Sequence, residues 1–182
     1  MKQRTAEELA AALDAIRESP STHGTVELIV RRPAVDEREV LEEGRIDLDA
    51  GLVGDSWRPR GNPHTPDGSA DPEAQLTLMN ARAIEAIAGA RERWPLAGDQ
   101  LYVDLDLSFE NLPAGTHLAV GEAVVEVTPE PHAGCAKFSA RFGSDALKFV
   151  NKPPGRELRL RGVNARVVTP GLVRVGDSVA KL

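Results

Sequence analysis

Alternation of apolar and polar positions along this chain predicts short strands as its main elements. Gln100 to Leu107 alternates in the way a half-buried strand does, with Asp104 and Asp106 on the same, solvent-facing side as Tyr102. The tail from residue 158 onward has turns at Pro170-Gly171 and Gly176-Asp177. Strands are expected at residues 25–30, 40–48 with a turn at Gly44, 75–79, 100–107, 117–128 as a strand-turn-strand unit, 158–163, 165–169 and 178–180.

Apolar residues at helical spacing predict helices at intervals between these strands. Thr5 and Glu8 have the spacing of a capping box, so a helix should begin at about residue 6. Asn80 should cap a second helix that ends at Gly89. Residues 137–151 should form two short helices separated at Gly143. Between residues 58 and 72 the density of Pro and Gly indicates a long loop.

Composition narrows the fold and the classes of partner. Aromatic residues make up only 4% of the 182 residues, alongside 16 Gly and 13 Pro, so aliphatic side chains must fill a strand-rich core. The net charge of −6, without clustered basic and aromatic residues, argues against a nucleic-acid partner. No apolar run approaches membrane-spanning length, and a single cysteine cannot form an internal disulfide. We therefore expect no membrane partner and a cytoplasmic location.

Candidate chemistry centres on Cys135, the only cysteine, in a segment that runs from Pro129 to Phe138. His132 precedes it by three residues, and Lys137 and Arg141 follow it. A thiol acts as nucleophile or metal ligand as its thiolate, which nearby cations and helix N-termini favour. The alternative is that Cys135 is a small buried apolar side chain without chemistry.

Four segments together resemble the MOSC family, named after the C-terminal domain of molybdenum cofactor sulfurases. They are residues 51–55 (GLVGD), 109–112 (FENL), the loop ending at Cys135 and Lys137, and 162–177. The resemblance implies a mainly β fold with several α-helices, a closed β-barrel with peripheral helices. The barrel domain would span residues 21–182, after an N-terminal helical extension at residues 1–20.

The resemblance also implies a ligand, a molybdenum cofactor of the pyranopterin (molybdopterin) type or a sulfur-bearing relative. Cys135 would then be a molybdenum ligand or a sulfur carrier, because soft thiolate suits such a centre. A small-molecule substrate and an electron-donor or sulfur-donor protein would be the partners. Expected counter-charges for the anionic cofactor are Arg31, Arg32, Lys137, Arg141 and Arg166. Expected hydrogen-bond partners of the pterin are Asn111, Thr128 and His132.

The sequence departs from the family pattern at two places and leaves other functions open. Phe109 replaces a common glycine, and His132 and Gly134 stand where many members have Arg and Pro. One alternative is a cysteine-dependent hydrolase or transferase with His132 as base, although no residue that orients the imidazole is evident. The other is a binding module that keeps the barrel without catalysis.

Overall fold

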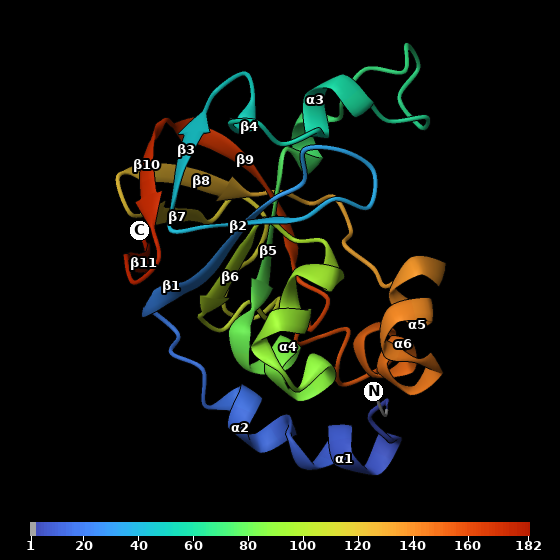
Figure 1. Cartoon of the computed structure of the whole chain (residues 1–182). Helices are drawn as coiled ribbons and strands as arrows, with labels where there is room; N and C mark the ends of the chain where they lie inside the picture. Colours follow the sequence, from blue (N-terminus) through green and yellow to red (C-terminus); the bar gives the residue numbers. More distant parts are fainter. Residues whose placement is uncertain (1–2) are drawn as a thin grey trace.

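A closed mixed β-barrel of seven strands forms the centre of the molecule, of which the computed structural model describes residues 3–182 (Figure 1). In order around the barrel, the strands are β1 (His23–Arg31), β6 (Leu101–Asp104), β5 (Leu76–Asn80), β9 (Val163–Thr169), β8 (Ala123–Val127), β7 (His117–Val120) and β11 (Ser178–Lys181). Pairing of β11 with β1 closes the barrel, and β5 and β6 are its one parallel pair among the described residues. The expected MOSC-type closed barrel is confirmed.

Four shorter strands extend this framework. β2 (Glu39–Leu41) adds to β1, and a separate sheet contains β10 (Gly171–Arg174), β3 (Glu43–Asp47) and β4 (Gly51–Leu52). The turn expected at Gly44 is wrong, because Gly44 is a buried position of β3 opposite Val173. A Cβ atom there would lie 2.7 Å from Leu52 Cδ1, so glycine meets a packing need at this position.

Most of the helices gather at one end and one side of the barrel, whereas α3 lies at the opposite end, near β4 (Figure 1). The helices are α1 (Ala6–Ala11), α2 (Leu13–Arg17), α3 (Trp57–Arg60), α4 (Ala81–Ala88), α5 (Ala136–Phe142), α6 (Ser144–Asn151) and the 3₁₀ helices η1 (Pro72–Ala74) and η2 (Arg91–Ala97). The capping box of Thr5 and Glu8 is confirmed. So are the Asn80 cap and the break at Gly143. None of the helices in residues 3–182 is long and apolar enough to cross a membrane.

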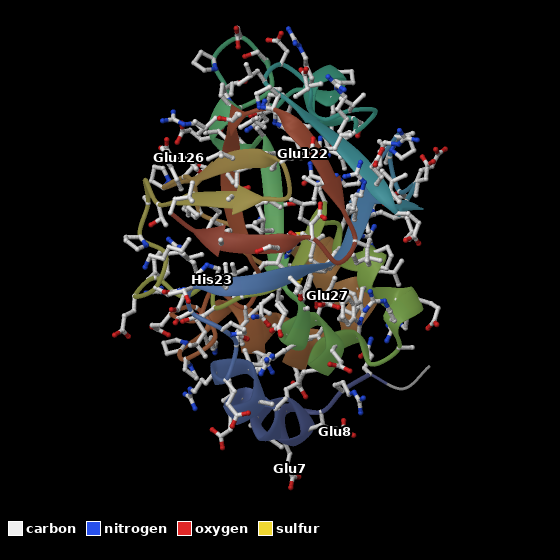
Figure 2. All side chains as sticks on the ribbon, turned by 90° about the vertical axis from the view of Figure 1, so that its left-hand side faces the viewer. Glu7, Glu8, His23, Glu27, Glu122 and Glu126 are labelled. Atoms are coloured by element: carbon white, nitrogen blue, oxygen red, sulfur yellow. The ribbon has the colours of Figure 1, made fainter. Side chains whose placement is uncertain are left out.

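Two apolar layers hold these parts together. Aliphatic side chains such as Leu78, Leu101 and Val125 fill the barrel interior, as the composition predicts. A second layer lies between the barrel wall and the helices. Burial alternates along β8, so Glu126 extends from the outer surface of the barrel (Figure 2).

Tyr102 belongs to the second layer, and its expected solvent exposure is wrong. Its side chain is buried, and its hydroxyl donates a hydrogen bond to the Trp94 carbonyl oxygen at 2.7 Å. Strand alternation places Tyr102 on the outside of the barrel, but helices cover that side here. Leu9 and Ile16 of the N-terminal helices pack into the same layer. The boundary between residues 20 and 21 stays a prediction, and residues 1–2 lie outside the described residues.

The tail differs from its expected three strands. Residues 158–162 form turns, and the strand expected there is wrong. Arg159 and Gly162 have φ angles of 48° and 109°, which a strand does not allow. The segment Gly171–Arg174 is the additional strand β10. These turns carry arginines toward the loop that holds Cys135.

Candidate functional site

Cys135 lies at the end of the loop that leaves β8, immediately before α5. It is exposed, so the buried-cysteine alternative is wrong. The Asn151 side chain fixes the preceding residue: its Oδ1 accepts from Gly134 N at 2.8 Å and its Nδ2 donates to Gly134 O at 2.9 Å. A Cβ on Gly134 would lie 2.9 Å from both Leu147 Cδ1 and Val150 Cγ2. Close packing of this loop on α6 therefore presents the sulfur to solvent.

The thiol opens onto a pocket of about 260 Å³, here named the basic pocket. Its wall brings together strand ends, loops and α5, and one carboxylate, Asp36, lines it. The cations that line it are Arg32, Arg38, Arg60, Lys137 and Arg141. The structure thus brings Arg32, Lys137 and Arg141 to Cys135, as the sequence predicts, and adds two arginines that the sequence does not indicate.

Ion pairs neutralise only some of these cations. Arg32 forms a bidentate ion pair with Asp55. Its Nε donates to Oδ2 at 2.9 Å and its Nη2 donates to Oδ1 at 2.8 Å. Asp36 lies 2.8 Å from Arg141 Nη2 and 3.6 Å from Lys137 Nζ. Across residues 3–182, neither Arg38 nor Arg60 has a carboxylate within ion-pair distance.

Crowding of positive charge also affects the arginine pKa values. Burial, followed by the charges of Arg141 and Arg32, lowers the pKa of Arg38. Burial and the Arg32 charge lower the pKa of Arg60. Cations that repel one another and lack carboxylate partners favour binding of an anion.

The surroundings of Cys135 also favour its thiolate. Partial burial raises the pKa of the thiol, but the backbone N–H groups of Phe138 and Lys137 act in the opposite direction. The charges of Arg161 and Arg141 add to this effect, and the net result is a pKa below the ordinary value. Such a thiol is more reactive at neutral pH than a free cysteine.

We expect alkylation of Cys135 by iodoacetamide to follow a titration with a midpoint below the free-cysteine pKa of about 8.5. Only the thiolate reacts, and a lowered pKa moves its formation to lower pH. Mass spectrometry of the labelled chain across pH measures this midpoint. Arg141→Gln should raise the midpoint, whereas Arg17→Gln on α2 should leave it unchanged. A wild-type midpoint at or above that of free cysteine would contradict the expected thiolate environment.

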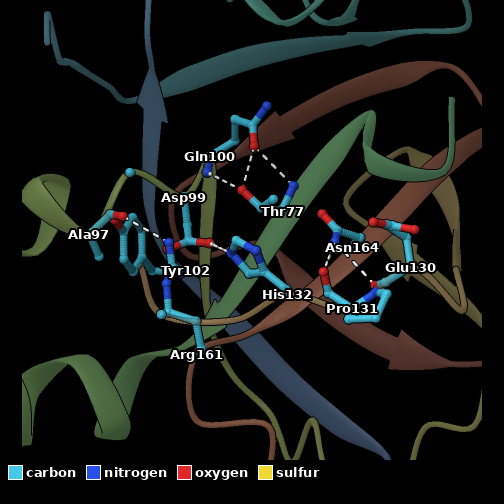
Figure 3. Close-up of polar contacts among 12 residues, drawn as sticks. Thr77, Ala97, Asp99, Gln100, Tyr102, Glu130, Pro131, His132, Arg161 and Asn164 are labelled. Atoms are coloured by element: carbon cyan, nitrogen blue, oxygen red, sulfur yellow. Dashed lines mark hydrogen bonds and ion pairs between the residues drawn. The ribbon is translucent and has the colours of Figure 1, made fainter. Parts of the chain in front are cut away.

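His132 points away from this chemistry, toward a buried ionic cluster (Figure 3). Its Nε2 lies 2.8 Å from Asp99 Oδ1, and Arg161 Nη1 lies 2.6 Å from Asp99 Oδ2. Arg161 Nη2 also donates to the Ala97 carbonyl oxygen at 2.9 Å. Burial raises the pKa of the Asp99 carboxyl, but Arg161 and His132 outweigh burial and hold it well below its usual range.

The protonation of His132 follows from this cluster. Burial, followed by the charge of Arg161, lowers the pKa of the imidazole more than Asp99 raises it. A neutral ring must then donate Nε2–H to the ionised Asp99 and leave Nδ1 as an acceptor. No hydrogen bond joins His132 to Cys135, and the two residues line different pockets. The expected Cys135–His132 pair is therefore not formed, although Asp99 supplies the orienting group that the sequence does not reveal.

The remaining predicted residues lie elsewhere. Thr128 lines the pocket that His132 lines, and its Oγ1 donates to Glu73 O. None of the other three predicted residues lines the basic pocket. Arg31 pairs with Glu39, Asn111 with the backbone of Ser21 and Asp106, and Arg166 with Glu126 and Glu73. Sequence reasoning did not identify Arg38, Asp55, Arg60, Asp99 and Arg161 as part of the site; only Asp55 had a local signal, the Gly54-Asp55 turn.

Comparison with known proteins agrees with this architecture. Residues 65–180 match the family model described as MOSC domain. YuaD from Bacillus subtilis has a TM-score of 0.65 at 15% identity, covering 86% of this chain and 94% of that one. YiiM from Escherichia coli has a TM-score of 0.55 at 17% identity, covering 87% of this chain and 69% of that one. YiiM from Geobacillus stearothermophilus has a TM-score of 0.53 at 12% identity, covering 90% of this chain and 74% of that one.

These structural similarities establish the fold, because the identities are low. None of the curated proteins matches this chain. The family match covers more than half of the sequence and includes the Cys135 loop, both short helices that follow it and the arginine-bearing turns. The chain therefore belongs to the MOSC domain family.

Proposed function

We propose that this protein binds a molybdenum cofactor of the pyranopterin type, or a sulfur-bearing relative, through Cys135. The observation that carries the proposal is an exposed thiol of lowered pKa on a pocket lined by five cations and one carboxylate. Membership of the MOSC domain family supports the same ligand class.

The chemistry of the donor set fits such a group. Thiolate is a soft ligand and suits a sulfur-rich metal centre, whereas a dithiolene and a phosphate are anionic and suit Arg38 and Arg60. No cluster of three or more His, Cys, Asp or Glu side chains in residues 3–182 is arranged to hold a metal. Cys135 would then be the protein ligand, and the cofactor would contribute the other sulfur atoms.

Each side chain of the basic pocket has a separate role in this proposal. Arg32, held rigidly by Asp55, presents a fixed guanidinium on the pocket that Cys135 also lines. Lys137 and Arg141 share the exposed Asp36, a pairing that an incoming anion can replace at small cost. When bound, the cofactor supplies a metal that changes oxidation state while oxygen or sulfur is transferred. A small-molecule substrate and an electron-donor or sulfur-donor protein complete the proposed reaction.

A cysteine-dependent hydrolase receives no support from this geometry. Asp99 orients His132 as such a mechanism requires, but the oriented imidazole does not face the thiol. A non-catalytic binding module would have the same pocket as the proposed enzyme and would differ from it only in turning over no substrate.

The test is the molybdenum and pterin content of protein produced in a host that makes the cofactor. Wild type should carry both, and Cys135→Ser should lose at least about 90% of the metal because a hydroxyl is a poor ligand for a soft centre. Arg60→Gln should reduce loading, since it removes an unpaired cation from the pocket. Arg58→Gln is the matched control, because Arg58 lies on the same short helix but outside the pocket. Unchanged metal in Cys135→Ser, or none in wild type, would refute the proposal.

A further inference from the structure

A second pocket has a volume of about 480 Å³ and is here named the large pocket because it is larger than the basic pocket. Its walls are the loop between β8 and α5, the end of α6 and the turns before β9. It shares no lining residue with the basic pocket. The Asp99–His132–Arg161 cluster links the two, since Asp99 follows Gly98 of the basic pocket and bonds two residues of the large one. Its volume is that of a small-molecule site.

The lining combines flat apolar surfaces with cations that lack acidic partners. Phe109 is 54% exposed, and the guanidinium carbon of Arg159 lies 3.8 Å from the centre of its ring. Across residues 3–182, Arg156 and Arg159 have no carboxylate within ion-pair distance. Glu130 is the carboxylate of the lining, and its residue is exposed. Such a site favours a flat anion over a cation or an uncharged polar molecule.

Arg161 also lines this pocket, but it offers a ligand neither an unpaired charge nor an accessible donor. Arg161 is 7% exposed, and its Nε has no hydrogen-bond partner although both Nη atoms are bonded. This nitrogen is sealed from solvent, so a ligand in the pocket cannot contact it. Arg161 is already paired with the Asp99 carboxylate. Arg156 and Arg159 are therefore the cations that can pair with a bound anion.

His132 supplies an acceptor on the same pocket. Its Nε2 is engaged by Asp99, while Nδ1 has no hydrogen-bond partner in the described part of the chain. Nδ1 is not sealed from solvent, so a ligand can reach it. Asn164 donates to the carbonyl oxygens of Glu130 and Pro131 at 3.1 and 3.2 Å (Figure 3), which fixes the loop that carries His132. The acceptor is therefore preformed.

We propose that the large pocket binds a small planar organic anion, whose carboxylate contacts Arg156 and Arg159 and whose hydroxyl or N–H group donates to His132 Nδ1. The ring of such a ligand would pack beside Phe109. This site goes beyond the proposed function and uses none of the residues of the basic pocket. It is expected in protein that holds no cofactor, so failure of molybdenum loading leaves it unaffected.

The experiment uses the full chain, produced in a host that does not make the cofactor, and 4-hydroxybenzoate as the probe. Calorimetry and NMR titration should give a Kd of about 1 mM or tighter for this small ligand. Phenol lacks the carboxylate and should bind at least about tenfold more weakly. Benzoate lacks the hydroxyl and should bind more weakly than the probe by about fivefold.

Variants assign the contacts. Arg156→Gln should weaken the probe at least about fivefold, since its exposed side chain contributes charge and no packing of the core. Lys152→Gln removes a charge from the same segment outside the pocket and should change nothing. His132→Phe should make 4-hydroxybenzoate and benzoate bind equally. No binding by folded wild type up to about 10 mM, equal binding by Arg156→Gln, or loss of binding in Arg60→Gln would overturn the proposal.

Discussion

Arg161→Met is expected to lower the free energy of unfolding by about 3–5 kcal/mol. Its guanidinium is the closest cation to Asp99, at 2.6 Å, and the Asp99 side chain is 0% exposed. Methionine keeps much of the apolar packing over Phe138 but leaves a carboxylate buried with only a neutral imidazole as partner. Removing one member of a buried pair costs far more than the pair contributes, because the remaining charge cannot be solvated. Urea unfolding monitored by tryptophan fluorescence measures the loss.

The control is Arg141→Met, in which an arginine loses an exposed partner, Asp36. Asp36 is 60% exposed and can be solvated when its partner is lost, so that pair should contribute less than about 1 kcal/mol. The double variant Arg161→Met/Asp99→Leu, which leaves no unpaired charge in this cluster, should recover part of the stability lost in Arg161→Met. Additive losses in the double variant, or a loss in Arg161→Met no larger than in the control, would show that the cluster does not act as a unit.

The Asp99–Arg161 pair also illustrates a limit of sequence reasoning. Its members are separated by 62 residues, and neither stands in a local pattern that indicates its partner. Local signals, by contrast, gave correct elements: the Asn80 cap and the break at Gly143 depend on neighbouring residues only. Tyr102 was predicted on the correct side of its strand, but what covers that side depends on helices distant in sequence.

The residues of the candidate site also fall into two groups, those that the local sequence indicates and those that only the tertiary structure brings to the site. Lys137 and Arg141 were found because they follow Cys135 on one helix, four residues apart. Arg38 and Arg60 reach the basic pocket only through the folding of loops, which no periodicity predicts. Family resemblance pointed to Cys135, whereas tertiary structure decides which arginines accompany it. Of the adjacent Arg31 and Arg32, only Arg32 lines the pocket. Arg31 is the last residue of β1 and pairs with Glu39 of β2, whereas Arg32 lies in the loop that follows β1.

Arg32 and Arg31 also differ in the burial of their carboxylate partners. Arg32→Gln should therefore lower the free energy of unfolding by about 3–5 kcal/mol. Asp55 has a fully buried side chain, and its oxygens accept from Arg32 Nε and Nη2 and from the backbone N–H of Arg32 and Trp57. Glutamine removes the guanidinium and leaves this carboxylate with neutral donors only. Arg31→Gln is the matched control one residue away, with a partner, Glu39, that is 46% exposed. Its loss should stay below about 1 kcal/mol.

The same two variants test whether stability and site geometry are coupled. Arg32 also donates to the Gly98 carbonyl oxygen at 2.9 Å, and Gly98 and Arg32 both line the basic pocket beside Cys135. We therefore expect Arg32→Gln, and not Arg31→Gln, to lower molybdenum loading as well as stability. Asp55→Asn should reproduce the loss of stability and release Arg32 from its fixed position, although the cation itself remains. Equal losses of stability in the two arginine variants would mean that Asp55 is solvated in the folded protein, which its complete burial argues against.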